Sequence, residues 1–176
     1  MEKLILIRPT AEYANQILEC KKEYLVANSS MDGCGPMRRT DDAMEYIEKC
    51  AIEENPETCP TSLVPATQFM LVRKEDNKVL GFLQVRHRFN DYLSKFGGHI
   101  GYSVRPSERH RGYAKEMLRM VLPFCREIGL DKVLITCMDG NIASEKTILA
   151  NGGVYECTVH EPSENKDMKR FWITFE

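Results

Sequence analysis

Three cations and a glycine stand together in the stretch RHRGYA, residues 109–114. An apolar run precedes it and an amphipathic stretch follows, so we expect a turn between a strand and a helix. Positive side chains at a helix N-terminus oppose the helix dipole, because the backbone N–H groups there already carry partial positive charge. The small Gly112 also lets successive N–H groups point at one spot. The turn therefore predicts a site for an anionic group, and a diphosphate would fit it.

Other interpretations of the turn stay open at this point. A glycine at a helix start with solvated cations would give the same pattern, with Glu108 and Glu116 as their ion-pair partners. A P-loop is disfavoured because no Gly-Lys-Ser/Thr follows the glycine. A dinucleotide-binding Rossmann turn is disfavoured because its G-x-G-x-x-G spacing is missing. The phosphate interpretation therefore depends on the elements around the turn.

Hydrophobic periodicity predicts a chain in which strands and helices are interspersed. The expected strands cover residues 3–8, 69–73, 79–87, 99–105, 133–137, 154–159 and 170–175. The first expected helix begins with Thr10 as its N-cap, and residues 40–42 cap a second. Two more are expected from about 114 to 128 and over about 142–151. This order, without repeats or low-complexity tracts, favours an α/β (α+β) protein with a mixed sheet and helices on both faces.

Composition excludes several classes of protein. A chain of 176 residues with 43% hydrophobic and 28% charged residues is typical of one globular domain. Its net charge of −2 argues against nucleic acid as the main partner. The seven cysteines are scattered without a C-x-x-C pair, which favours reduced thiols over zinc or redox chemistry, and no metal is expected. No run is long enough for a signal peptide or a membrane span, so we expect a cytoplasmic protein with no membrane partner.

Two stretches together carry a resemblance to a known family. They are SVRPSERHRGYAKEML, residues 103–118, and VLITCMDGNIASEKTILANGG, residues 133–153. In the second, Asn141 stands three residues before Ser144, and Gly152 and Gly153 follow. Over nearly the full chain, this arrangement resembles the GNAT superfamily of acyl-CoA-dependent N-acetyltransferases. The resemblance implies a single acetyltransferase domain over residues 1–176, with a mostly antiparallel sheet of about seven strands and about four helices on both faces.

The resemblance also implies a cosubstrate, acetyl-CoA, and the residues that hold it. Its pantetheine arm would lie between the strand ending at Arg105 and the strand ending at Cys137. The residues implied in cosubstrate binding are Val104, Arg109, Arg111, Gly112, Tyr113, Ala114, Lys115, Asn141 and Ser144.

These residues have different implied roles. The amides from Arg111 to Ala114 would hold the pyrophosphate, while the Arg109 side chain would fix the loop. Arg111 and Lys115 could also meet the 3′-phosphate. Asn141 would bond the pantetheine, which is compatible with its capping the helix that follows. Ser144 would lie near the sulfur.

The implied reaction is direct attack of a primary amine on the thioester in a ternary complex. It needs a base, donors for the developing oxyanion and an acid for the leaving thiolate. His99 and Tyr102 are the candidate bases, although a structural histidine and a core tyrosine would also explain them. They point to opposite faces of a regular strand, unless a bulge intervenes. Many family members have a tyrosine acid seven residues beyond the asparagine, where this chain has Ile148.

The acceptor is the least specified part of the prediction. The loop SSMDGCGPMRR and the turn HEPSENKD would wall its site, and Asp32, Glu161 and Glu164 are candidates for attracting an amine. Both a small-molecule amine and a peptide amine fit, and a homodimer stays open. The alternative function is a catalytically silent GNAT-fold module that binds CoA or a protein.

Overall fold

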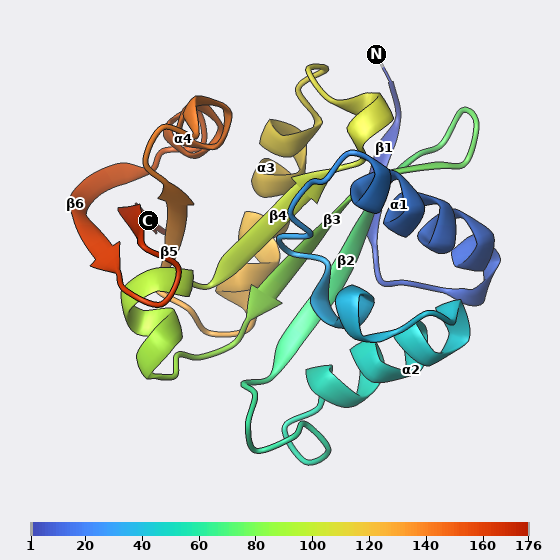
Figure 1. Ribbon diagram of the computed structural model, residues 1–176, viewed down its shortest axis with the longest axis horizontal. Helices are drawn as coiled ribbons and strands as arrows, with labels where there is room; N and C mark the ends of the chain where they lie inside the picture. Colours follow the sequence, from blue (N-terminus) through green and yellow to red (C-terminus); the bar gives the residue numbers. More distant parts are fainter. Residues whose placement is uncertain (1, 176) are drawn as a thin grey trace.

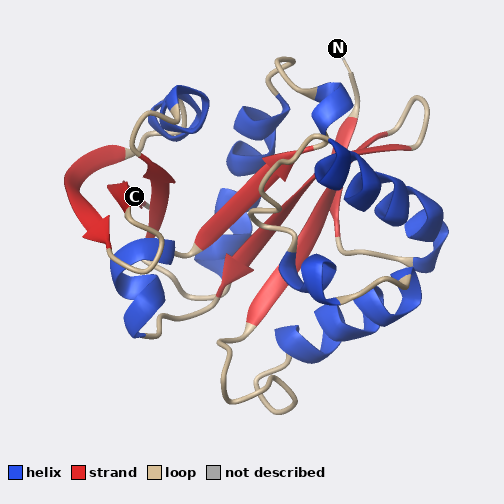
Figure 2. Cartoon of the chain, viewed as in Figure 1, coloured by secondary structure: helices blue, strands red, loops and turns tan. Residues whose placement is uncertain are grey.

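The structure, a computed structural model, describes residues 2–175 and contains seven strands in two sheets (Figure 2). Strand order in the first sheet is β1-β2-β3-β4, and the members are β1 (Leu4–Ile7), β2 (Ala66–Arg73), β3 (Lys78–Arg86) and β4 (Ile100–Val104). Strand order in the second sheet is β5-β7-β6, and the members are β5 (Lys132–Met138), β6 (Val154–Glu161) and β7 (Lys166–Thr174). All neighbouring pairs are antiparallel. The predicted α/β fold with about seven strands is confirmed.

Four α-helices pack on these sheets, as Figure 1 shows. They are α1 (Ala14–Val26), α2 (Ala43–Glu54), α3 (Tyr113–Glu127) and α4 (Ile142–Leu149). Short 3₁₀ turns lie at η1 (Ala11–Tyr13), η2 (Gly35–Arg39) and η4 (Pro106–Glu108), and a π-helix, η3 (Leu93–Gly97), precedes β4. None of the described helices is both long and apolar enough to cross a membrane.

Of the two helix N-caps predicted for the first half of the chain, one is correct and one is wrong. The Asp42 side chain accepts a hydrogen bond from the Glu45 amide at 2.8 Å and so caps α2. Thr10 precedes η1 rather than α1, and its side chain makes no capping bond. The predicted Thr10 cap is therefore wrong, because the 3₁₀ turn takes up the first residues of the expected helix.

Alternation along β2 sorts the core into two layers. Met70 and Val72 point to the cluster formed with α1 and α2, whereas Leu71 between them points to the cluster formed with α3. Phe82 and Leu83 of β3 divide in the same way. The first sheet is therefore buried on both faces, which explains why β2 and β3 are apolar almost without interruption.

The two sheets meet at His99, immediately before β4. Its amide donates to the Leu134 carbonyl of β5 at 2.8 Å, and its ring Nδ1 accepts from the Leu134 amide at 2.9 Å. The ring lies against Phe89, with the ring centres 4.0 Å apart. Beyond this contact β4 and β5 belong to different sheets and diverge (Figure 1). His99 is thus the junction from which the two strands separate.

Burial and the charge of Arg86 lower the pKa of His99 from 6.5 to about 4, so folding favours the neutral ring. The unfolded chain then binds the extra proton first, and this contribution to stability is complete above pH 6.5 and is lost as the pH falls toward about 4. We expect the free energy of unfolding of the wild-type protein to fall over this range by up to about 1.4 kcal/mol per pH unit more than that of His99→Asn. Asparagine keeps an acceptor near the Nδ1 position but does not titrate. Denaturant unfolding at several pH values measures the difference, and parallel losses in the two proteins would contradict the assignment.

Candidate active site

The backbone between β4 and α3 takes two left-handed residues, His110 at φ +63° and Gly112 at φ +84°. The first amide of α3 to bond back is that of Glu116, which donates to the Gly112 carbonyl at 3.2 Å. Within residues 2–175, the amides of Tyr113, Ala114 and Lys115 have no hydrogen-bond partner. A Cβ built on Gly112 would meet nothing within 4 Å. Free amides, a helix dipole and open space at one place form a cradle for an anion.

The cations of the turn are held by the protein rather than left beside the amides. Arg109 donates to the Val104 carbonyl at 3.2 Å and to the Ser29 hydroxyl at 2.6 Å, and so ties the turn to β4 and to the segment after α1. Arg111 lies 3.3 Å from Glu108, and its side chain is 57% exposed. Its position at the surface leaves it able to contact an anion as well. The Lys115 side chain is exposed on the first turn of α3.

Tyr113 contributes only its backbone to this cradle. Its ring is buried, and its hydroxyl donates to Glu2 at 2.8 Å and accepts from Arg73 at 3.0 Å. These partners lie on the side of β1 and β2, so the ring anchors the start of α3 to the first sheet. Ala114 is half-buried next to it.

Glu108 is a buried carboxylate surrounded by cations. It accepts a hydrogen bond from Lys78 and lies 3.4 Å from Arg73, in addition to its contact with Arg111. Burial would raise its pKa, but the Lys78 hydrogen bond and the neighbouring positive charges outweigh burial and hold the pKa of Glu108 below its ordinary value. The carboxylate therefore stays charged near neutral pH and neutralises part of the positive charge at the helix start.

A hydrogen bond joins β4 to α4 where the sheets separate. The hydroxyls of Tyr102 and Ser144 lie 2.7 Å apart, and either can donate. Asn141 caps α4, since its Oδ1 accepts from the Ser144 amide at 3.2 Å. Burial raises the pKa of Tyr102, so its phenol stays protonated at neutral pH. The hydroxyl is thus a hydrogen-bond donor rather than a base.

The other predicted catalytic position, His99, is even less suited to accept a proton from an amine. It is 5% exposed, its Nδ1 is occupied by the Leu134 amide, and its lowered pKa makes it a weak base. Ile148, which stands where the family has a tyrosine, is fully buried in the core beside Gly153. Its side chain serves packing.

The acidic residues predicted to attract an amine have different surroundings. Glu161 is buried and accepts from the Ser163 hydroxyl at 2.6 Å and the Glu164 amide at 2.7 Å, so it shapes the β6–β7 turn. Glu164 pairs with Lys166. Asp32 is exposed and accepts from the Ser30 hydroxyl at 2.7 Å. Of the three, Asp32 is the carboxylate least engaged by the fold.

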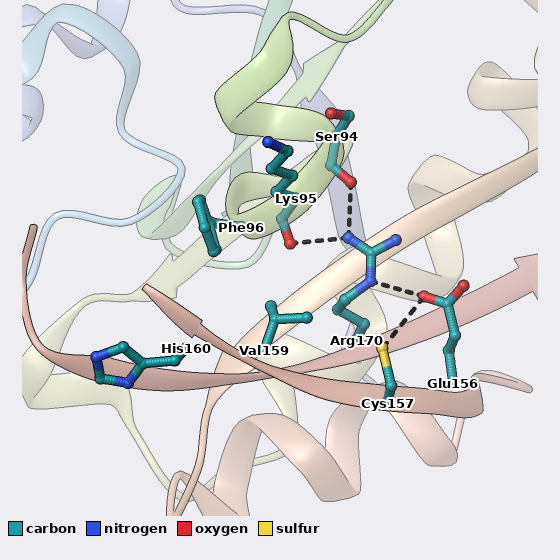
Figure 3. A pocket seen from close by; sticks show the side chains of 8 residues that line it. All are labelled: Ser94, Lys95, Phe96, Glu156, Cys157, Val159, His160 and Arg170. Atoms are coloured by element: carbon teal, nitrogen blue, oxygen red, sulfur yellow. Dashed lines mark hydrogen bonds and ion pairs between the residues drawn. The ribbon is translucent and has the colours of Figure 1, made fainter. Parts of the chain in front are cut away.

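Two cavities lie on the side of the sheets opposite α3 and α4. The larger, about 430 Å³, lies between η3 and the strands β6 and β7, where Arg170 donates to Glu156 at 2.6 Å and to the carbonyls of Ser94 and Lys95 (Figure 3). The smaller, about 220 Å³, is lined in part by Gln84 and Arg86 of β3. Gln84 and Arg86 were not among the site residues predicted from the sequence. The available signal was the pair of polar residues, two apart, at the end of an otherwise apolar strand.

Comparison with known proteins gives the family. A family model described as an acetyltransferase (GNAT) domain matches residues 3–154. The chain therefore belongs to the GNAT acetyltransferase family. No curated protein sequence matches it at a significant level.

Solved structures confirm the fold. The microcin C7 self-immunity acetyltransferase MccE, solved with acetyl-CoA and AMP, is 16% identical, with a TM-score of 0.71 over 98% of this chain and 93% of that one. RimL, a ribosomal-protein α-N-acetyltransferase solved with coenzyme A, is 14% identical, with a TM-score of 0.69 over 98% and 94%. Spermidine N-acetyltransferase from Vibrio cholerae, solved with CoA and spermine, is 15% identical, with a TM-score of 0.67 over 97% and 95%. At these identities the likeness concerns the fold.

Gly112 and Gly129 form a matched pair for testing the cradle. Both have positive φ, +84° and +87°, both flank α3, and a Cβ on either meets nothing within 4 Å. Alanine at either position should destabilise the unliganded protein by about 1–2 kcal/mol through backbone strain alone. Only Gly112→Ala should also weaken CoA binding, by about tenfold or more, or about 1.4 kcal/mol, because its methyl group enters the cradle. Calorimetric titration with CoA checks this, and equal CoA affinities in the two variants would show that Gly112 serves the turn alone.

Proposed function

We propose that this protein is an N-acetyltransferase that transfers the acetyl group of acetyl-CoA directly to a primary amine. The observation that carries the proposal is the set of amides from Tyr113 to Lys115 that have no partner within residues 2–175, beyond the end of β4, where that strand has already diverged from β5. Three amides at one helix N-terminus suit a pyrophosphate, and the similar structures of MccE and RimL were solved with acetyl-CoA and with coenzyme A. Arg109 holds the cradle in place, while Arg111 and Lys115 supply positive charge at its exposed rim.

The remaining predicted binding groups lie on β4 and α4. The Val104 carbonyl already accepts one bond from Arg109 and keeps a second lone pair for the amide groups of a pantetheine arm. Asn141 has its oxygen on the Ser144 amide and its NH₂ group available. A cosubstrate held by both groups would have its reactive end near the hydroxyls of Tyr102 and Ser144.

In the reaction, the amine nitrogen bonds to the acetyl carbon, the carbon–sulfur bond breaks, and the thiolate of CoA takes a proton. The paired hydroxyls of Tyr102 and Ser144 are the groups of this chain best placed to donate to the sulfur, since each can supply a proton that the other replaces. Neither His99 nor Tyr102 acts as the base in this proposal. The acceptor ammonium gives one proton to solvent water before it attacks, and the nitrogen loses a second proton as the amide forms, which balances the proton that the CoA thiolate takes up.

A second candidate function is a catalytically silent module that binds CoA or a protein. The buried Ile148 favours it, because the family's usual acid is absent from α4. The two functions differ in one observation: both bind CoA, but only the enzyme releases CoA from acetyl-CoA when an amine is present.

CoA and acetyl-CoA should stabilise the folded protein. At about one hundred times the dissociation constant, the linked free energy is roughly 2.7 kcal/mol, which raises the Tm by about 5–11 °C for a chain of this length. A thermal melt with and without CoA measures the shift. A well-folded sample whose Tm does not change in millimolar CoA would count against the proposed function and against the silent CoA-binding module alike.

If the hydroxyls of Tyr102 and Ser144 share one role, removing each of them should have non-additive effects on kcat. Tyr102→Phe and Ser144→Ala should each lower kcat by less than about tenfold, because the other hydroxyl or water still donates, while the double variant should lose about 10²–10⁴-fold, a typical contribution of one general acid. Steady-state release of CoA measures kcat, and CoA affinity should be unchanged in all three. If Ser144→Ala alone loses as much as the double variant, Ser144 is the sole donor and the shared role is wrong.

A further inference from the structure

Gln84 and Arg86 are alternate residues of β3 and face the side of the first sheet that α1 and α2 cover. Both line the smaller cavity, beside Gly35 and Tyr92 from two other segments. The β3 strand is otherwise apolar over most of its length, so two polar side chains on this buried face need partners.

Arg86 is a cation without a carboxylate partner in the described part of the chain. Its Nη1 donates to the carbonyls of Gly97 at 3.2 Å and Gly98 at 3.4 Å, and its Nε and Nη2 groups make no hydrogen bond within residues 2–175. Burial lowers the pKa of Arg86, an effect that the nearby Asp32 and Tyr92 only partly oppose. A guanidinium nevertheless stays charged, so its remaining N–H groups are available to an anion.

Gln84 is 8% exposed, and its carboxamide makes no hydrogen bond within the same residues. Its neighbour Gln68 donates through Nε2 to the Gly33 carbonyl at 2.7 Å, while its buried Oε1 has no hydrogen-bond partner within residues 2–175. A Cβ on Gly35 would lie 3.1 Å from Gln84 Nε2 and 2.5 Å from Gln68 Oε1. The glycine therefore leaves open the space in front of the two amides.

The charge of the cavity favours an anion. Arg39 and Glu53 also line it, but they neutralise each other in an ion pair at 2.7 Å. The positive charge of Arg86 remains uncompensated by a direct ion pair. Because a planar carboxylate accepts two parallel hydrogen bonds from a guanidinium, it suits this site better than an ammonium or a neutral group.

The cavity lies one strand away from the proposed point of transfer. Gln84 pairs with Gly101 across the β3–β4 ladder, and a Cβ on Gly101 would lie 3.3 Å from Arg86 Nη2. Tyr102 follows Gly101 directly and contacts Ser144. Tyr102 packs on the α3 side of the sheet and Arg86 faces the side of α1 and α2, so a small molecule bound by Arg86 would extend its amine toward this position through the opening between β4 and β5.

We propose that the acceptor is a small amine that carries a carboxylate, and that Arg86 and Gln84 bind the carboxylate. The inference rests on the proposed N-acetyltransferase function and specifies its substrate class. A polyamine would bring a cation to Arg86, and the N-terminus of a long peptide would bring no carboxylate unless a side chain supplied one. Both are expected to be poor acceptors.

The test compares matched amines that differ only in the carboxylate: lysine with cadaverine, serine with ethanolamine, and 4-aminobutyrate with propylamine. Release of CoA is followed with a thiol reagent against a blank without acceptor, because the protein has seven free cysteines of its own. We expect kcat/KM to favour the carboxylate member of the best pair by about 10–100-fold, as for hydrogen bonds to a charged group. Arg86→Gln should remove this preference and leave the decarboxylated amine within about twofold, whereas the exposed Arg88→Gln should change neither.

Calorimetry with CoA-loaded protein separates this proposal from the proposed function. If CoA binds but no amine is acetylated, binding of a carboxylate-bearing amine to the wild-type protein and not to Arg86→Gln still supports the carboxylate site. Equal use of both members of every pair, a preference for polyamines, or an equal loss for both members in Arg86→Gln would overturn it. Should Arg86→Gln fail to fold, competition by propionate against the amine in the wild-type enzyme decides, and the absence of competition overturns the proposal.

Discussion

The backbone hydrogen bond that joins the two sheets, the one such bond within residues 2–175, is the constraint on which the site depends. Immediately before β4, the His99 amide donates to the Leu134 carbonyl of β5, and the histidine ring takes the place of the next carbonyl in accepting the Leu134 amide. A side chain that ends a ladder in this way satisfies the buried amide while letting the strands part. Gly98 makes the approach sterically feasible, because its φ is +67° and a Cβ there would lie 2.5 Å from the Leu134 carbonyl. The opening between β4 and β5 thus depends on the backbone geometry of Gly98 and on the hydrogen bonds of His99.

The cations at the start of α3 acquire an explanation from the same geometry. Placed beside the positive end of a helix they would destabilise it, but Arg109 is directed back to β4 and Ser29, and Arg111 shares the carboxylate of Glu108. Glu108 in turn spreads its charge over Lys78 and Arg73. The network leaves the first amides of the helix unpaired, which is the property an anion site requires.

The sequence was sufficient for the elements and for the turn that carries the proposed anion cradle, because both depend on local signals. Periodicity located all seven strands and four helices, and Gly112 marked the turn through its backbone conformation. The roles of His99 and Tyr102 were not accessible in the same way. Their partners, Leu134 and Ser144, lie 35 and 42 residues away along the chain, and only the relative position of β4, β5 and α4 brings them together. Residue type allowed either a base or a structural histidine at position 99, and burial and an occupied Nδ1 argue for the structural role.

Arg86 and Gln84 were not predicted because their surroundings also come from segments far apart in the sequence. Comparison with Arg170 shows how an arginine that can bind a ligand differs from one whose guanidinium is already held by partners within the protein. Arg170 lines the larger cavity, yet Glu156 and two carbonyls hold its guanidinium, so an added anion would have to displace an existing partner (Figure 3). Arg86 is half-buried, as Arg170 is, but it has no carboxylate partner within residues 2–175. Folding has already removed part of the water around the Arg86 guanidinium. An anion that binds there is attracted to the charge and causes less further desolvation of the protein. Although its volume is smaller, the cavity beside Arg86 is therefore the better candidate of the two for binding a charged substrate.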